Sequence, residues 1–155
     1  MTTINPYLTF NGTCEEAFNL YQSVFGGEFQ HVNRYSEMPS EHPLPESEKN
    51  KIMHIALPIS KETMLMGSDS SAVFGTATQI GDNVSISINT TTDDEAKRIF
   101  EALSAGGEIK MPLEKTLFSD SVRAADNRKG PSCHKGQHPL RNSFVIFANL
   151  TFGNS

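Results

Sequence analysis

Two segments of the chain have apolar residues at the spacing of an amphipathic helix. In each segment the apolar positions recur every three or four residues, so they fall on one face of a helix. These positions are Ala17, Phe18, Tyr21, Val24 and Phe25 in the first segment, and Ala96, Ile99, Phe100 and Leu103 in the second. The pattern predicts two helices, each with one face packed against a core.

The two predicted helices also share their end signals. Each begins with Thr and has Glu three residues later, which is the capping-box pattern, and each is followed by a Gly-Gly pair that can close a helix in the left-handed region. Matching positions lie about 80 residues apart, which indicates two copies of one unit. The matched signals are Thr13, Glu16, Gly26 and Gly27 in the first copy and Thr92, Glu95, Gly106 and Gly107 in the second.

Alternation of apolar and polar residues predicts the strands. Leu8 and Phe10 indicate a strand before the first helix, and Val84, Ile86 and Ile88 one before the second. After the first helix we expect a strand over 29–35, a polar loop over 36–50, and a hairpin with strands 52–59 and 63–67. After the second helix, 108–111 is typical of a strand.

These elements predict an α+β protein made of two paired strand–helix–strand–strand–strand modules. We expect a first module over residues 1–68, a Ser- and Gly-rich linker over 69–82, and the start of a second module over 83–118. Residues 119–155 form an atypical tail, in which 119–142 is polar and punctuated by Gly and Pro, as loops are. Alternating apolar residues predict one late strand over 144–152.

Composition and charge narrow the class of protein. The net charge of −5 disfavours a general nucleic-acid-binding protein, which needs a basic face. The N-terminal sequence has no signal-peptide pattern, no apolar run is long enough to span a bilayer, and the two cysteines make no disulfide framework. We therefore expect a soluble cytoplasmic protein with no membrane partner.

Four blocks of sequence, in order, resemble the PhnB-like family of the vicinal oxygen chelate superfamily, which also contains glyoxalase I, bleomycin-resistance proteins and extradiol dioxygenases. The blocks are Phe10–Gly27, Ile52–Leu57, Leu65–Asp69 and Asp94–Gly107. The resemblance covers roughly residues 4–117. It implies paired βαβββ modules, a U-shaped mixed sheet with the helices on its outer face and a small-molecule pocket inside, and a homodimer.

The resemblance ends after about Thr116. The family continues there with Trp-containing strands, whereas this chain has no Trp. A reading-frame change in the source gene, or replacement of the last two strands, would explain the difference. We therefore expect a second module that is incomplete or altered after residue 117.

The superfamily's divalent metal is expected at positions that this chain fills with poor ligands. The resemblance places the first-strand ligand at Asn5 or Pro6, the fifth-strand ligand at Asn83, and the fourth-strand ligand among residues 64–66, which are Met, Leu and Met. Thioether and aliphatic side chains do not hold a hard divalent metal. We predict no metal site and no cofactor, although a divalent metal stays an alternative. Cys133, His134 and His138 make only a loose cluster, and His31 and His42 have no predicted partner.

Strand parity predicts the lining of a ligand pocket. If Leu8, Phe10 and the apolar positions of the fifth strand face the helices, their neighbours point to the other side. These neighbours are Asn5, Tyr7, Thr9, Asn83, Ser85 and Ser87, and with His54 and Met66 (or Met64) from the following strands they make up the predicted lining. Such a lining is polar and uncharged, with Met as an adaptable apolar element. Ordinary solvent-facing alternation explains the same pattern equally well.

His54 is the one weak catalytic candidate. Its imidazole could act as a general base, or it could be a structural group bonded to a neighbouring strand. Ser68 and Asp69 are better explained as a turn and a helix cap than as catalytic groups. Nothing in the sequence resembles the glycine-rich loop that a methyltransferase cofactor would need. Three functions stay open: a glyoxalase-like enzyme, a protein that binds or sequesters a small molecule, and an inactive remnant.

Overall fold

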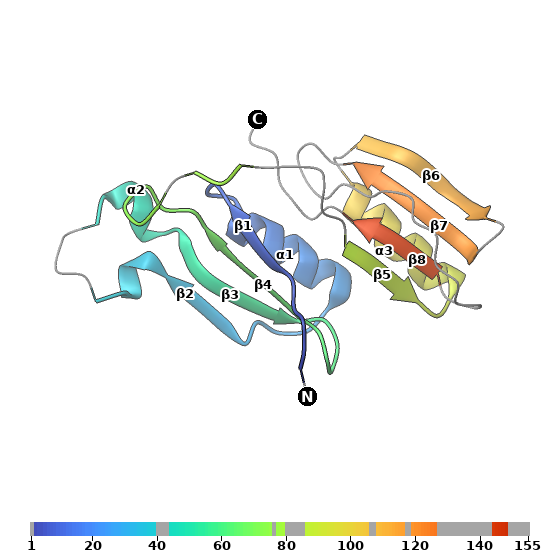
Figure 1. The fold of residues 1–155 in the computed structure, drawn as a ribbon, viewed down its shortest axis with the longest axis horizontal. Coiled ribbons are helices and arrows are strands. Elements are labelled where there is room, and N and C mark those ends of the chain that lie inside the picture. The colour runs from blue at the N-terminus through green and yellow to red at the C-terminus, as the bar shows by residue number, and fades with distance from the viewer. Residues whose placement is uncertain are drawn as a thin grey trace. The chain divides into compact units, whose positions relative to one another are not determined.

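The computed structural model describes residues 2–39, 44–75, 77–79, 86–105, 108–116, 119–126 and 144–148 of the chain. From residue 108 onward it describes the backbone alone. The chain divides into two compact units, Met1–Gln79 and Ile80–Ser155 (Figure 1). Both are α+β, with a mixed four-stranded sheet and one helix of 12 residues in each.

The first unit has the predicted strand–helix–strand–strand–strand order. Its sheet runs β1-β4-β3-β2, with β1 parallel to β4 and the other pairs antiparallel. Two short helices in the β2–β3 connection occupy part of the segment expected to be a loop. The elements are β1 (Tyr7–Phe10), α1 (Cys14–Phe25), β2 (His31–Arg34), the 3-10 helix η1 (Tyr35–Glu37), α2 (Glu46–Lys49), β3 (Ile52–Pro58) and β4 (Met64–Asp69).

The second unit repeats the order of elements and of strands, but not every strand direction. Its sheet runs β5-β8-β7-β6, and β8 lies antiparallel to β5 and parallel to β7. The corresponding strand of the first unit, β4, has the opposite relations to its two neighbours. The elements are β5 (Ile86–Thr90), α3 (Asp93–Ser104), β6 (Glu108–Thr116), β7 (Ser119–Asp126) and β8 (Phe144–Ala148).

The C-terminal segment therefore corrects one expectation and refines another. Residues 119–126, expected to be loop, form β7, and the second sheet has four strands rather than an incomplete set. The late strand is present over Phe144–Ala148, and the rest of the predicted range, 149–152, lies outside the described residues. Two strands joined by the short turn of a hairpin would be antiparallel, so the parallel pairing of β7 and β8 differs from the antiparallel pairing of β3 and β4. The module is thus altered in strand direction.

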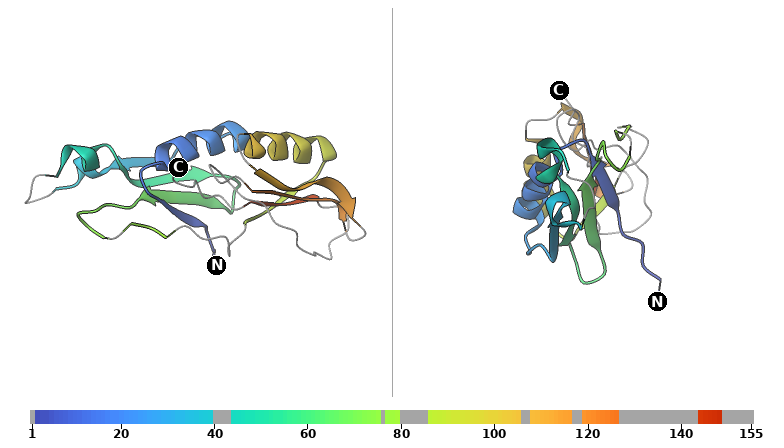
Figure 2. Two further views of the ribbon diagram at one scale, coloured as in Figure 1. Left: turned by 90° about the horizontal axis from the view of Figure 1, so that it is seen from above. Right: turned by 90° about the vertical axis from the view of Figure 1, so that its left-hand side faces the viewer.

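Helix α1 covers one face of the first sheet and contacts β3 and β4 (Figure 2). Four of its five predicted apolar residues are buried: Ala17, Phe18, Tyr21 and Val24. The helix can lie close because β4 carries Gly67 beneath it. A Cβ atom at Gly67 would lie 2.6 Å from Cε2 of Phe18, so no larger residue fits there without a shift. In α3 all four predicted apolar positions are buried.

The beginning of α1 differs from the predicted capping box. The Thr13 side chain makes no capping bond, and its buried hydroxyl has no hydrogen-bond partner. Asp69, at the end of β4, takes this role instead. Its Oδ1 accepts the backbone N–H groups of Gly12 (2.9 Å) and Cys14 (3.0 Å), and its Oδ2 accepts that of Ile52 (2.9 Å). One carboxylate thus joins α1, β3 and β4.

The α3 cap is closer to the prediction, since the Thr92 hydroxyl accepts the N–H of Glu95 at 3.3 Å. At the end of α1, Gly26 and Gly27 have the positive φ angles expected of them, 77° and 87°. Gly106 and Gly107 lie outside the described residues. Within the described segments no helix is long and apolar enough to cross a bilayer.

Candidate functional site

The side of the first sheet turned away from α1 carries most of the described candidate residues. Pairing aligns Tyr7 with Met66, Met66 with Ala56, and Ala56 with His31. Because side chains alternate along a strand, every second residue from these positions points to the same side. We call this surface the Tyr7 face. Its residues are Tyr7, Thr9, His31, Asn33, His54, Ala56, Met64, Met66 and Ser68.

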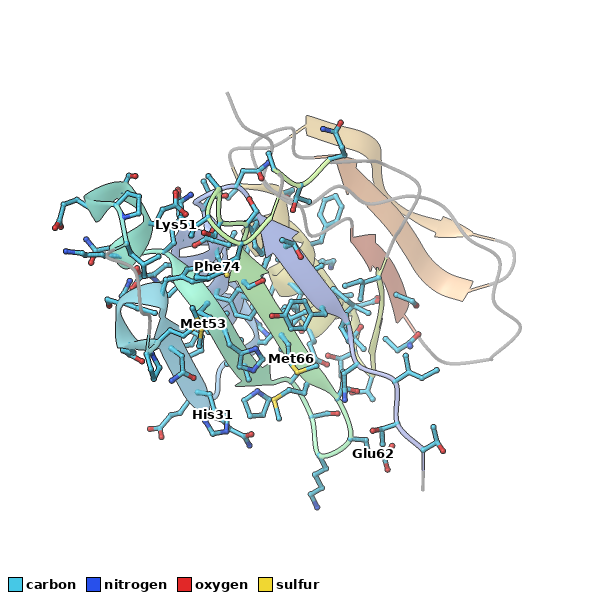
Figure 3. The ribbon with its side chains drawn as sticks, turned by 60° about the vertical axis from the view of Figure 1, so that its left-hand side comes forward. His31, Lys51, Met53, Glu62, Met66 and Phe74 are labelled. Atoms are coloured by element: carbon cyan, nitrogen blue, oxygen red, sulfur yellow. The ribbon has the colours of Figure 1, made fainter. Side chains whose placement is uncertain are left out.

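Tyr7 and His54 meet on this face although they come from strands that are not neighbours. β4 lies between β1 and β3, and the two side chains reach across it. Their ring centroids are 5.9 Å apart with an angle of 27° between the planes, and Tyr7 Oη lies 3.4 Å from His54 Nδ1. Tyr7 is 49% exposed, so much of its side chain remains accessible. Figure 3 shows His31 and Met66 on the same face.

The strands of the first sheet contain two ionised side chains, and both are held on the α1 side. Arg34 donates Nη2 and Nη1 to the two carboxylate oxygens of Glu15 on α1, at 2.6 and 3.0 Å. The pKa of Glu15 falls below its usual value, chiefly because of this hydrogen bond. Asp69 is bound to the start of α1. The strand residues of the Tyr7 face therefore include no carboxylate, ammonium or guanidinium group.

The buried titratable groups behind the sheet are poorly suited to reaction. Cys14, the first residue of α1, is fully buried, and burial is the main cause that raises the pKa of its thiol, with the carboxylate of Asp69 second. Burial likewise raises the pKa of Tyr21. A nucleophilic cysteine needs a lowered pKa and access to its target. Cys14 is a core residue.

Of the eight residues predicted to line a pocket, four lie together on the Tyr7 face: Tyr7, Thr9, His54 and Met66. Asn5 has a structural role, because its Oδ1 accepts the N–H of Met64 at 2.9 Å. Ser87 is exposed on β5 in the second unit. Asn83 and Ser85 lie outside the described residues, as do His42, Cys133, His134 and His138.

The sequence analysis missed His31, Asn33 and Ser68 as members of this face. Asn33 pairs with His54 across β2 and β3, and His31 pairs with Ala56. Their parity along each strand was available as a signal. The missing information was the pairing register, which includes an irregularity between Asn33 and Arg34.

A divalent metal does not fit the described residues at the superfamily positions. The Asn5 oxygen is already bonded to the Met64 amide, and residues 64–66 offer only thioether and aliphatic groups. Among the described side chains, no three His, Cys, Asp or Glu residues gather in a way that could hold a metal ion. On the Tyr7 face the thioethers of Met64 and Met66 are soft donors and imidazole is a borderline donor, whereas hard cations prefer oxygen ligands.

Comparison with known proteins places the chain in a family. A model of the 3-demethylubiquinone-9 3-methyltransferase family, which is the PhnB family, matches residues 2–121. The chain belongs to the PhnB-like family. The match ends near the point where the sequence resemblance was found to end.

Relatives from two bacteria agree with this assignment, and a solved structure from a third shares the fold. Protein YjdN of Escherichia coli is 26% identical over 137 residues, which cover 82% of this chain and 89% of YjdN. The crystal structure of protein PA1353 from Pseudomonas aeruginosa is similar with a TM-score of 0.69 and 28% identity, over 99% of this chain and 100% of that one. The PhnB protein of Bacillus cereus has the same fold, with a TM-score of 0.62, 20% identity and the same coverage.

The methyltransferase in the family's description does not fit the described geometry. A nucleotide-type cofactor is commonly held by a glycine-rich turn between a strand and a helix, at free backbone amides. Here the β1–α1 turn has one glycine, Gly12, and the amides of Gly12 and Cys14 donate to Asp69. The carboxylate of the chain's own Asp69 thus occupies the place of such a ligand.

Proposed function

We propose that this PhnB-like, glyoxalase-like protein binds a small molecule without the divalent metal of the vicinal oxygen chelate superfamily, and that the Tyr7 face forms part of the binding surface. The observation that carries the proposal is the meeting of Tyr7, His54 and Met66 on a face whose strands present no ionised group. Such a surface suits binding by contact and a few hydrogen bonds.

The larger assembly is part of the same proposal. In it, the chain pairs with a second copy as a homodimer, as the family resemblance implies. Binding or sequestration is the favoured function. The presence of four strands in the second sheet favours a functional protein over an inactive remnant.

A glyoxalase-like enzyme is the second candidate, and the contact between Tyr7 and His54 favours it. A hydroxyl close to Nδ1 would orient the imidazole, so that Nε2 could exchange a proton with a bound substrate. In this case His54→Gln abolishes turnover but leaves ligand affinity within a few-fold. For a binding protein no turnover exists to be lost.

A metal assay combined with a ligand screen tests the proposal. The purified chain is dialysed against a chelator, its metal content is measured, and its thermal unfolding is followed with a library of small oxygenated metabolites and drugs. Stabilisation of metal-free protein by a ligand, lost in Tyr7→Leu, supports the proposal. One equivalent of Ni, Zn, Fe or Mn that resists dialysis overturns the metal-free part, and no response to any compound overturns the binding function.

A further inference from the structure

The Tyr7 face offers one aromatic ring whose surroundings select the kind of ligand. Tyr7 contacts His54 on one side, yet 49% of the residue remains exposed. Its pairing partner on β4 is Met66, which is half-buried and polarisable. An accessible ring beside a thioether is a surface on which another flat ring can stack.

The second selective feature is a directed donor. The contact with Tyr7 engages Nδ1 of His54. When Nδ1 accepts the phenol proton, the proton of the neutral imidazole is on Nε2. Among the described residues, no side chain is hydrogen-bonded to Nε2 of His54, so this nitrogen can donate to an acceptor in the ligand.

The third feature is the lack of formal charge. Arg34 and Asp69, the two ionised residues of these strands, are bonded to groups at the start of α1 on the opposite side of the sheet. The carboxylate of Glu37 on η1 accepts the side-chain N–H of Asn33 at 3.3 Å beside this face, but the strand side chains of the face themselves offer no counter-charge to a charged group on a ligand. An uncharged ligand loses less hydration on binding there.

We propose that the Tyr7 face binds a flat, uncharged aromatic molecule that carries a carbonyl or a ring acceptor. Its ring stacks on Tyr7 beside Met66, and its acceptor receives the Nε2 proton of His54. This inference rests on the proposed binding function and deepens it by naming the ligand class.

The probe is coumarin, a flat aromatic lactone, and δ-valerolactone is its saturated counterpart. Full-length protein is labelled with ¹³C at the methionine methyl groups, and each compound is titrated to millimolar concentration. We expect coumarin, but not δ-valerolactone, to shift the Met66 methyl resonance through its ring current. Because the chain has no Trp, no indole ring of the protein itself contributes to this signal.

Three variants separate the contributions. Tyr7→Leu should weaken coumarin about tenfold, the effect typical of losing one stacked ring. His54→Phe keeps an aromatic neighbour but loses the donor, so it should weaken coumarin about fivefold and leave indole, which lacks a carbonyl, unchanged. Val32→Ala is the control, since Val32 is also an exposed apolar residue (40%) but pairs with Ile55, on the side of the sheet opposite to the Tyr7 face.

The results also separate this inference from the proposed function. An unshifted Met66 methyl in the wild-type protein at millimolar coumarin overturns the inference without the use of any variant. Equal binding of δ-valerolactone, or unchanged affinity in a folded Tyr7→Leu protein, overturns it as well. If other compounds stabilise the protein while coumarin does not bind, the ligand class is wrong and the binding function stands.

Discussion

Asp69 anchors the first unit, and its replacement tests that role directly. The side chain is buried, 3% exposed, and its carboxylate accepts three backbone N–H groups. In Asp69→Ala the Gly12 amide can turn to water, because Gly12 is exposed. The amides of Cys14 and Ile52 are buried, and an unsatisfied buried donor costs about 1–3 kcal/mol. We therefore expect Asp69→Ala to lower the free energy of unfolding by about 3–4 kcal/mol.

Asp69→Asn gives a graded comparison. The amide keeps one carbonyl oxygen for the α1 amides but turns an NH₂ group toward the N–H of Ile52, so we expect a smaller loss of about 2 kcal/mol. The assay is urea unfolding followed by circular dichroism, since the chain has no Trp. With a slope of about 1.5 kcal/mol per molar urea, Asp69→Ala should shift the midpoint by about 2 M.

Glu62→Gln is the matched control, because Glu62 is exposed in the β3–β4 turn, and it should change stability by less than about 0.5 kcal/mol. A loss below about 1 kcal/mol for Asp69→Ala would refute the reasoning. It would mean that water or a neighbouring group replaces the carboxylate at both buried amides.

Three further changes test other parts of the first unit and the cap of the second. Gly67→Ala should cost about 1–3 kcal/mol by urea unfolding, because the new methyl would lie 2.6 Å from the α1 ring above it, whereas Gly75→Ala, with its nearest neighbour at 4.0 Å, should cost little. Equal effects would show that α1 moves away freely. Thr13→Val should leave the free energy of unfolding unchanged or raise it, since the buried Thr13 hydroxyl has no hydrogen-bond partner. Thr92→Ala removes a capping bond and should lower the free energy of unfolding by about 1 kcal/mol. A loss of stability in Thr13→Val as large as that in Thr92→Ala would show that the Thr13 hydroxyl does cap α1. Glu15→Gln should cost at most about 1 kcal/mol at neutral pH, because this ion pair is exposed. The pKa of Glu15 is lower in the folded protein than its unfolded value of 4.5. The stability that the ion pair adds is therefore fully present above pH 4.5 and is lost as the pH falls through the folded pKa. A stability difference between the wild type and Glu15→Gln that persists in acid would contradict this.

Much of the fold could be predicted because local patterns coincide with tertiary packing. The apolar spacing from Ala17 to Val24 matches the buried side of α1, and the same holds from Ala96 to Leu103 in α3. Tyr7 and His54, both named in the predicted pocket lining, lie on one face of the first sheet, and their role in binding stays a prediction. The capping box at Thr13 failed because a stronger acceptor, a buried carboxylate, comes from a distant strand.

The sequence by itself determined the two amphipathic helices, the alternation along the strands, and the family. Tertiary structure alone decided that Tyr7 meets His54 across β4, that Asp69 caps a helix far earlier in the chain, and that β8 runs parallel to β7. The physical reason is that spacing along a chain controls which side a residue faces, whereas the pairing register controls which residues become neighbours. Register depends on the summed packing of both strands and the helix above them, so no single segment carries it.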